Sequence, residues 1–468
     1  MGYPFFIQRK AELMRENTYH LFRHIMKPIS RFVNGKMLSS VLLLASAGAA
    51  FAWANSNFSS SYYALWEIPI SFSIGGVGIS DTLGHWVNNG LMAIYFFVIG
   101  LEIKREILVG ELSNVQNATL PALAALGGMI VPAVLYMAFN QGEPGEAGWG
   151  IPMATDIAFS LGCLQVLGSL VPVALKIFLL ALAIFDDMGA ILVIALFYTN
   201  EINLISLGAG IFILLASIIL NIKGVRKVYP YALLGIAFWV AFFYSGIHAT
   251  IAGVLLALTI PARSLYDQET FVKESNNIIE EFPQKDFSIM MVDENQRQIM
   301  KQLQGAVDDL NTPLQKLEDK LYPLASYFIL PLFALANAGV NVAQGSEGSS
   351  LLNPITIGIV VGLFIGKPLG ITLFSWLSIR WGIAKLPDKT NWSQMLGAAC
   401  LAGIGFTMSL FITNLAFAEN IFIYEAKIAI IIGSGLSAFL GTAIFLISNS
   451  RSRAKIQKAA DIMSKPAD

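Results

Sequence analysis

Charged residues are scarce in this chain: of its 468 residues only 13% are Asp, Glu, Lys or Arg, whereas 55% are hydrophobic. The mean hydropathy of +0.64 is too high for a folded chain whose whole surface meets water. The shortage of charge therefore excludes an ordinary water-soluble globular protein. We expect a protein that lies within a lipid bilayer.

Cysteine is also rare, and two kinds of binding motif are missing. Cys163 and Cys400, the two cysteines, fall in apolar stretches without metal-ligand spacing, which argues against a disulfide framework. No basic stripe with interleaved aromatic residues is present, so we expect no nucleic-acid partner. Gly366-Lys367-Pro368 lacks the Ser or Thr that follows the lysine of a phosphate-binding loop. The chain thus shows no nucleotide-binding site. If it performs work in the membrane, we expect an ion gradient and not nucleotide hydrolysis to supply the energy.

Long apolar stretches are what the chain has in abundance. A helix needs about 20 mainly apolar residues to cross the hydrocarbon core of a bilayer, and about twelve stretches meet this requirement. They cover residues 37–54, 83–101, 118–139, 151–169, 173–198, 204–221, 229–244, 246–261, 322–341, 354–377, 392–415 and 424–448.

The placement of basic residues predicts the orientation of these spans. With the N-terminus inside, 28 of the 30 Lys and Arg residues fall on the inner side, as expected for cytoplasmic loops. The exceptions are Lys427, at an outer helix end, and Lys367, within a span. We therefore expect both termini to be cytoplasmic.

The same pattern divides the chain into five segments. We expect a cytoplasmic N-terminal arm, membrane helices 1–8, a polar cytoplasmic insert, membrane helices 9–12 and a cytoplasmic tail. The segments cover residues 1–36, 37–261, 262–320, 321–448 and 449–468, in that order.

One short β-structure is predicted in the first outer loop. Apolar residues alternate at Ile68, Ile70, Phe72 and Ile74, just before Gly75-Gly76. This alternation indicates a β-hairpin within residues 66–80, with a plain loop as the alternative.

Four ionisable residues lie deep within predicted spans, away from their ends: Asp156, Asp186, Asp187 and Lys367. Each costs about 2.5 to 3.5 kcal/mol on membrane-insertion scales, so each calls for a functional explanation. Neighbouring residues on a helix point about 100° apart, so one carboxylate of the Asp186 and Asp187 pair can face a cavity while the other faces a helix. A purely structural ion-pair network is the alternative. For Lys367, neutralisation of an aspartate and carriage of a proton both remain open.

Two membrane stretches contain residues that interrupt helices. Pro152-Met-Ala-Thr155-Asp156 is poor in strong helix formers and begins with proline. Gly403-Ile-Gly405-Phe-Thr407-Met-Ser409 is the second such stretch, although glycine in a membrane helix is also common simply for close packing. Spans three to five and ten to twelve would then be corresponding halves, each with a broken middle helix.

Two further groups have both a functional and a structural interpretation. Glu102 and Glu106, with Lys104 and Arg105 between them, form either a charged cytoplasmic mouth or a solvated helix end. His248 follows Ser245-Gly246 and is either a pH sensor or a structural residue at the membrane boundary.

Taken together, these motifs resemble those of the NhaA family of sodium/proton antiporters. The resemblance covers roughly residues 80–261 and 316–447, and its motifs occur in the family's order. They are Gly100-Leu-Glu102-Ile-Lys-Arg-Glu106, Met153-Ala-Thr-Asp156-Ile-Ala-Phe, Ala183-Ile-Phe-Asp186-Asp187-Met-Gly-Ala, Ser245-Gly-Ile-His248-Ala-Thr, Leu330-Pro-Leu-Phe-Ala-Leu-Ala-Asn337-Ala-Gly, Gly366-Lys367-Pro-Leu-Gly and Gly403-Ile-Gly-Phe-Thr-Met-Ser.

The resemblance implies an all-α integral membrane protein of about twelve transmembrane helices, with NhaA-like inverted repeats and interrupted helices 4 and 11. In antiporters such as NhaA, the transported ions bind where discontinuous helices meet near the middle of the membrane. By this resemblance Asp187 and Asp186 bind Na⁺ and protons, Asp156 and Thr155 lie at the crossing, and Lys367 pairs with Asp186.

It further implies that Glu102, Glu106, His248 and Glu318 belong to the pH response or the cytoplasmic entrance. The expected activity is secondary exchange of Na⁺, or Li⁺, for H⁺ across the bacterial inner membrane, with sodium extruded at the expense of the proton gradient. We expect the protein to need no cofactor and to have no enzymatic activity. We also expect a homodimer that forms through the outer hairpin. An ion channel and an intramembrane aspartyl protease are the alternatives, although the protease pattern GxGD is absent.

Overall fold

The computed structural model describes residues 35–74, 77–199, 202–264, 268–281, 294–342 and 352–463. Most of the expected N-terminal arm lies outside these residues, as do residues 282–293 of the insert and the last five residues of the tail.

Helices make up almost all of the described chain. The α-helices are α2 (Gly35–Ala54), α3 (Ser59–Trp66), α4 (Leu83–His85), α5 (Met92–Val109), α6 (Val115–Asn140), α7 (Ile157–Leu167), α8 (Val173–Phe197), α9 (Leu204–Ile222), α10 (Val228–Ser245), α11 (Ala249–Thr259), α12 (Gln268–Glu280), α13 (Glu294–Leu310), α14 (Pro313–Leu324), α15 (Leu330–Asn337), α16 (Pro354–Val361), α17 (Lys367–Arg380), α18 (Trp392–Ala402), α19 (Phe406–Ala416) and α20 (Asn420–Met463). Short 3-10 or π segments join several of them: η1 (Trp86–Leu91), η2 (Glu111–Ser113), η3 (Glu146–Met153), η4 (Gly168–Leu170), η5 (Ala325–Ile329) and η7 (Gly362–Gly366).

The lengths and composition of these helices identify an integral membrane protein. Among the described residues, eight helical stretches are long and apolar enough to cross a bilayer, and the bent pair of α18 and α19 provides a ninth. These nine coincide with nine of the twelve predicted spans. The other three predicted spans, 83–101, 246–261 and 322–341, do not meet this criterion. They coincide with α5, which carries four charged residues, with α11 and α15, which are 11 and 8 residues long, and with the π segments beside α5 and α15.

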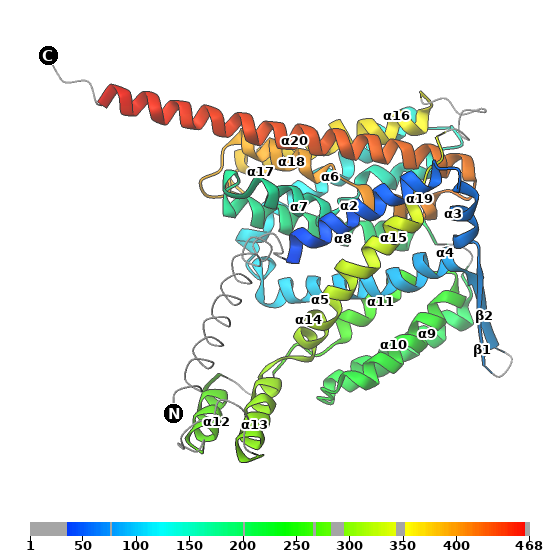
Figure 1. Ribbon diagram of the computed structural model, residues 1–468, viewed down its shortest axis with the longest axis vertical. Coiled ribbons are helices and arrows are strands. Elements are labelled where there is room, and N and C mark those ends of the chain that lie inside the picture. The colour runs from blue at the N-terminus through cyan, green and yellow to red at the C-terminus, as the bar shows by residue number, and fades with distance from the viewer. Residues whose placement is uncertain are drawn as a thin grey trace, which may run out of the picture.

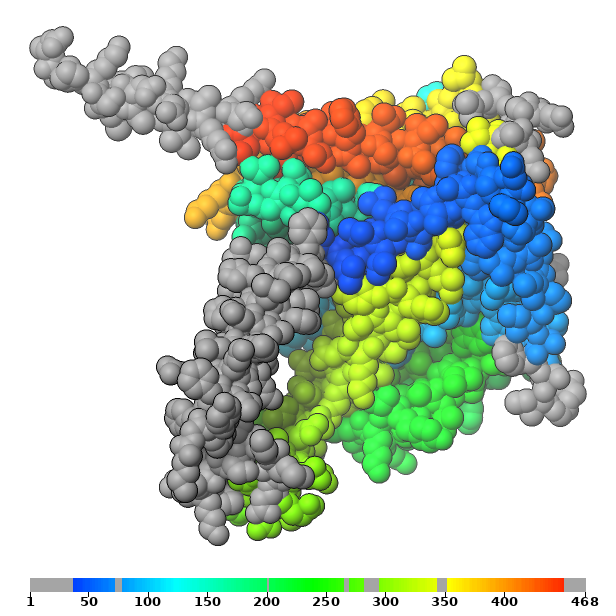
Figure 2. Space-filling view, in the orientation of Figure 1, coloured from blue at the N-terminus to red at the C-terminus, as the bar shows by residue number. Residues whose placement is uncertain are grey.

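The helices are arranged as a bundle with distinct ends and edges (Figure 1). α20 lies along one edge beside α18, and α9 and α10 form the opposite edge. The β-strands lie at one end of the bundle, whereas α12, α13 and the last turns of α20 project from the other. Figure 2 shows α2 and α15 side by side on one face, in agreement with their contacts.

The predicted β-hairpin is confirmed. Strand β1 (Pro69–Ile74) pairs antiparallel with β2 (Val77–Thr82), and Phe72 lies opposite Ile79. The hydroxyl of Tyr244 on α10 donates a hydrogen bond of 3.2 Å to the Gly78 carbonyl, which attaches the hairpin to the edge of the bundle.

Glycine allows the closest helix crossings. The longest contact joins α6 to α17, where a Cβ on Gly370 would overlap the Gly127 backbone. A second close contact joins α5 to α11, where a Cβ on Gly253 would lie 2.9 Å from the Phe97 nitrogen. Small residues dominate such contacts because lipid chains offer no hydrophobic drive between helices, so stability depends on close backbone packing.

Candidate ion-binding site

Two breaks in helical structure meet inside the bundle. Ala154, Thr155 and Asp156 lie outside any helix, between η3 and α7. Gly403 to Gly405 separate α18 from α19, whose axes are bent by 44°. Both breaks coincide with the stretches that the sequence marked as poor in helix formers.

Hydrogen bonds between the breaks satisfy backbone groups that a continuous helix would pair internally. The Asp156 amide donates to the Ile404 carbonyl at 2.7 Å. The Thr155 hydroxyl, whose proton goes to Asp186 at the shorter distance, also lies 3.0 Å from the Ala402 carbonyl oxygen. The Ser160 hydroxyl donates to the Leu401 carbonyl at 2.8 Å. Irregular backbone at membrane depth is tolerated only where it is buried in protein in this way or lines a cavity.

The Asp156 carboxylate closes this contact. One oxygen accepts the Phe159 amide at 2.9 Å, as an N-cap of α7. The other oxygen accepts both the amide and the hydroxyl of Thr407, at 3.0 and 2.6 Å. Both oxygens are therefore occupied by donors from the two broken segments.

Glycine is required where the breaks touch. A Cβ on Gly405 would lie 3.0 Å from the Ala154 carbonyl oxygen of the other break. A Cβ on Gly403 would instead lie 2.5 Å from the Leu363 carbonyl oxygen of η7 and 2.8 Å from the Ser437 hydroxyl of α20. A larger residue at Gly405 would therefore push the two breaks apart, whereas one at Gly403 would push this break away from η7 and α20.

Asp186 on α8 contacts Thr155 in the first break and Lys367 at the start of α17. It is 1% exposed, and its Oδ2 accepts the Thr155 hydroxyl at 2.6 Å. The same oxygen lies 3.0 Å from the Lys367 ammonium, whose side chain is completely buried. Lys367 also donates to the Met153 carbonyl at the end of η3. The structure thus brings Thr155, Asp186 and Lys367 together.

Asp187, the next residue, has a different environment. It is 2% exposed, and its Oδ2 is buried without a hydrogen-bond partner among the residues that the structure describes. Oδ1 of Asp186 is unpartnered in the same sense. A buried carboxylate oxygen without a donor is costly unless a proton or a cation binds it.

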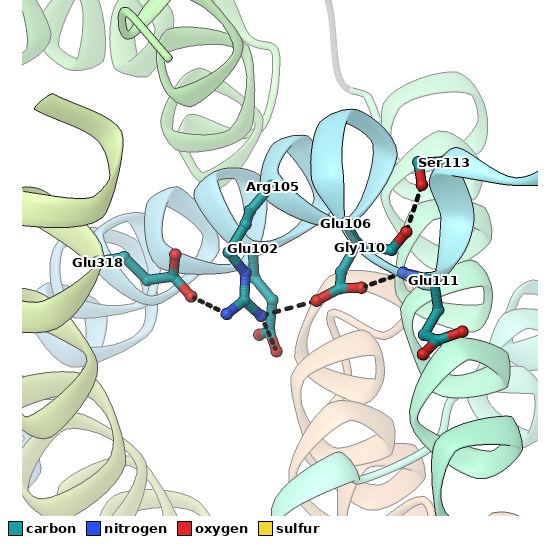
Figure 3. Close-up of polar contacts among 7 residues, drawn as sticks. All are labelled: Glu102, Arg105, Glu106, Gly110, Glu111, Ser113 and Glu318. Atoms are coloured by element: carbon teal, nitrogen blue, oxygen red, sulfur yellow. Dashed lines mark hydrogen bonds and ion pairs between the residues drawn. The ribbon is translucent and has the colours of Figure 1, made fainter. Parts of the chain in front are cut away.

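A second charged cluster lies at the far end of α5 (Figure 3). The Arg105 guanidinium is 2.8 Å from Glu106, 3.4 Å from Glu318 and 3.9 Å from Glu102. Burial raises the pKa of Glu318, and the neighbouring Arg105 opposes that rise. Three of the four residues assigned to the pH response or the entrance therefore share one cation.

His248, the fourth of these residues, lies elsewhere. Its Nδ1 is 2.9 Å from the Thr250 hydroxyl, and its ring packs edge-on against Phe411. It lines a pocket of about 260 Å³ that also includes His85, Asn88 and Asn414. The structure does not bring His248 to the cluster around Arg105.

Three groups at these sites are missing from the residues predicted by sequence. The Met153 carbonyl could not be found, because every residue has one and only the helix break exposes it. Thr407 had a signal, since it follows the second glycine of the break by two residues. Arg105 also had one, because it lies between Glu102 and Glu106.

The fold and the site together define a class of protein. The protein is a multi-pass helical membrane protein with buried carboxylates and a buried lysine where two helix breaks meet. Such intramembrane charges mark pathways for ions or protons.

Comparison with known proteins identifies the family. Residues 30–445 match the model of the Na⁺/H⁺ antiporter 1 family. The chain belongs to this family, which includes the NhaA antiporters.

Curated relatives agree over nearly the whole chain. The Na⁺/H⁺ antiporter NhaA of Koribacter versatilis is 44% identical over 425 residues, which cover 90% of this chain and 91% of the relative. The NhaA of Sulfurimonas denitrificans is 44% identical, covering 90% and 95%, and that of Oleidesulfovibrio alaskensis is 45% identical, covering 89% and 93%.

Membership of this family decides several expectations. The protein is a sodium/proton antiporter by family, that is, a transporter and not an enzyme, and antiporters of this family need no cofactor. The intramembrane aspartyl protease alternative is therefore wrong.

Proposed function

We propose that the protein exchanges Na⁺ or Li⁺ for H⁺ by alternating access, with Asp187 and Asp186 as the carboxylates that bind both ions. The observation that carries this proposal is the pair of buried, unpartnered oxygens, Oδ2 of Asp187 and Oδ1 of Asp186. Oxygen ligands suit a hard cation such as sodium. The cation is cargo in this proposal, not a resident metal.

Competition for the same carboxylates explains exchange. Asp187 is buried next to a second acid, so its charge is poorly tolerated unless a proton or a sodium ion neutralises it. If the site changes exposure only when one of these ions is bound, each crossing in one direction carries sodium and each return carries protons. Inward proton flow then extrudes sodium.

The other residues have supporting roles in this proposal. Thr155 and Lys367 hold Asp186. Asp156 joins its own break to the break that contains Gly403 and Gly405. Glu102, Glu106 and Glu318 form the cytoplasmic entrance around Arg105. His248 takes part in the pH response from its separate pocket.

The proposed architecture has twelve spans, with helices 4 and 11 interrupted and spans three to five related to spans ten to twelve by an inverted repeat. The contact between the two breaks supports this relation. Both termini and the 262–320 insert are then cytoplasmic in the bacterial inner membrane, and the hairpin of β1 and β2 lies outside as the contact of a homodimer. Reporter fusions at residue 345 and at the C-terminus test the orientation, since the two must report opposite sides.

Exchange in proteoliposomes tests the site. Addition of sodium to vesicles that hold the purified protein and a pH-sensitive dye should move protons, and Asp187→Asn should abolish this response. The amide keeps the size of the carboxylate but loses its charge and its titrating proton. Asp388→Asn, which changes an exposed aspartate outside the membrane helices, is the matched control and should keep the response.

Two outcomes would contradict the assignment. Sodium-dependent proton movement by folded Asp187→Asn at the parent rate would remove Asp187 from the site. Ion currents far above the turnover of a transporter would favour the channel alternative instead.

A further inference from the structure

Helices α12 and α13 each expose an apolar stripe. Val272 and Ile279 on α12 are 55% and 56% exposed, and Met300 and Val307 on α13 are 53% and 42% exposed. The members of each pair are seven residues apart, so they lie on one face of their helix. Both stripes lie in the polar insert, outside the apolar helices that meet lipid.

These stripes are not the faces through which the two helices contact each other. α12 packs against α13, and the half-buried apolar residues, Phe271 and Ile278 on α12 and Ile299 and Leu303 on α13, lie about a quarter turn from the stripes. Each helix therefore has a second apolar face beside the first. A helix pair that only had to stabilise itself would need one.

We propose that the part of the N-terminal arm that precedes α2, residues 1–34, docks on these stripes as a third helix of the same chain. The arm sequence has the required pattern. Met14, Leu21 and Ile25 recur at helical spacing, and Arg23, Lys27 and Arg31 recur every fourth residue on another face. An amphipathic basic helix of this kind has the two surfaces that the insert helices need.

Charge complementarity selects this partner. Residues 1–34 contain six basic and two acidic residues, whereas residues 268–281 and 294–310 together contain seven acidic and three basic residues. Glu269 and Glu280 lie beside the stripe of Val272 and Ile279 on the helical wheel of α12. Opposite charges at the rim would steer and orient the arm.

Position makes the contact feasible. The arm joins the bundle at Gly35, where α2 begins, and α2 packs against η5, the segment that directly follows α14. The first turn of α2 points toward the end of the bundle from which α12 and α13 project (Figure 1). Residues 5–27, between Pro4 and Pro28, would form a helix of 23 residues, about 35 Å long, which spans the described insert helices.

An anionic lipid surface is a poorer partner for the same stripes. Acidic side chains outnumber basic ones on α12 and α13, so these helices would be repelled by negatively charged headgroups. The basic arm covers the apolar surface and balances the charge at the same time.

Photo-crosslinking in the full-length protein tests the contact. We would place p-benzoylphenylalanine at Met300 and, as a matched control, at Gln298, an exposed residue on the opposite face of α13. Mass spectrometry should find adducts between the Met300 probe and residues 1–34, severalfold more than from Gln298. About 1 M NaCl, which shortens electrostatic screening to ~3 Å, should reduce this yield.

A charge swap keeps the test independent of folding defects. Glu269→Lys with Glu280→Lys should lower the crosslinking yield severalfold, and Arg23→Glu with Lys27→Glu in the same chain should restore it. Restoration cannot come from general disruption of the fold.

Three results would overturn the proposal. They are equal yields from Met300 and Gln298, adducts formed mainly with lipid, and adducts that join an isotopically labelled chain to an unlabelled one, which would place the arm on a second copy. Failure of the charge swap to restore the yield would also count against it.

Discussion

At the candidate ion-binding site, the single ammonium group of Lys367 contacts two partners. It pairs with Asp186 at 3.0 Å and donates to the Met153 carbonyl at the helix break. A lysine in this position neutralises the extra carboxylate and also binds the end of η3. Its charge and its hydrogen bonds are therefore separable contributions.

A double-mutant cycle separates them. Lys367→Ala should cost about 3 to 5 kcal/mol of stability, because it leaves Asp186 charged and uncompensated in a buried site. Asp186→Asn in the same chain should recover part of this loss, but not the bond to Met153. Thermal unfolding of both single variants and the double variant measures the coupling; purely additive losses would mean that the two charges are not paired.

Glu318 allows a prediction about pH. Because burial raises its pKa, the folded protein keeps this proton to higher pH than the unfolded chain does. Between the two pKa values the folded state binds more protons, so this contribution to stability is present at low pH and is lost as pH rises. Glu318→Gln should therefore gain stability relative to the parent protein as pH is raised through that window, measured by melting temperature.

Arg105→Gln provides the comparison. Since Arg105 opposes the rise in the pKa of Glu318, its removal should raise that pKa further, so the loss of stability becomes larger and extends to higher pH. An unchanged pH window would show that the guanidinium does not act on this carboxylate.

At the scale of elements, the two helix breaks depend on glycine. Gly405→Ala should lower stability by about 1 to 3 kcal/mol, the usual cost of overpacking, since the new methyl group would overlap the Ser409 hydroxyl and lie 3.0 Å from the Ala154 carbonyl oxygen. Gly435→Ala in α20 is the matched control, because its added Cβ meets no atom within 4 Å. It should be neutral or gain up to about 1 kcal/mol through better helix propensity. Equal effects of the two substitutions on the melting temperature would contradict the close approach.

The breaks also mark the limit of prediction from sequence. Proline, glycine and weak helix formers indicated both positions, because they act on the local backbone. The partners were not predictable, since Asp156 and Thr407 are 251 residues apart and no local pattern joins them. The same holds for the Met153 carbonyl, which can accept a hydrogen bond from Lys367 because η3 ends at this residue.

Whole helices followed the same division. Apolar length identified nine spans that also meet the criterion in the structure, because hydropathy reports directly on contact with lipid. Spans 83–101, 246–261 and 322–341 remain predictions. α11 and α15 are only 11 and 8 residues long, and α5 carries four charged residues between Glu102 and Glu106. Hydropathy and the isolated intramembrane charges thus predicted the class of protein and the candidate acids, but not their contacts.

At the scale of the molecule, the insert should be dispensable for exchange. α12 and α13 project from the bundle, whereas Leu314 is buried against Tyr231 and Leu101, and its amide donates to the Pro261 carbonyl. Replacing residues 264–312 with a short flexible linker should leave sodium-dependent proton movement measurable in proteoliposomes.

A deletion that extends through Leu314 and Glu318 is the informative contrast, because it removes bundle contacts and one partner of Arg105. If the shorter deletion inserts normally yet transports nothing, the insert belongs to the transport cycle.

The hydrogen bonds between the two breaks have a mechanical consequence. Sliding one broken helix past the other would strand buried donors and acceptors at Asp156, Thr407, Ile404 and Ala402, each at a cost of about 1 to 3 kcal/mol. For the alternating access proposed above, we therefore expect the two broken helices to move as one rigid body. Any movement that exposes Asp187 to opposite sides of the membrane has to occur at the seams around this body, where side chains slide without losing polar partners.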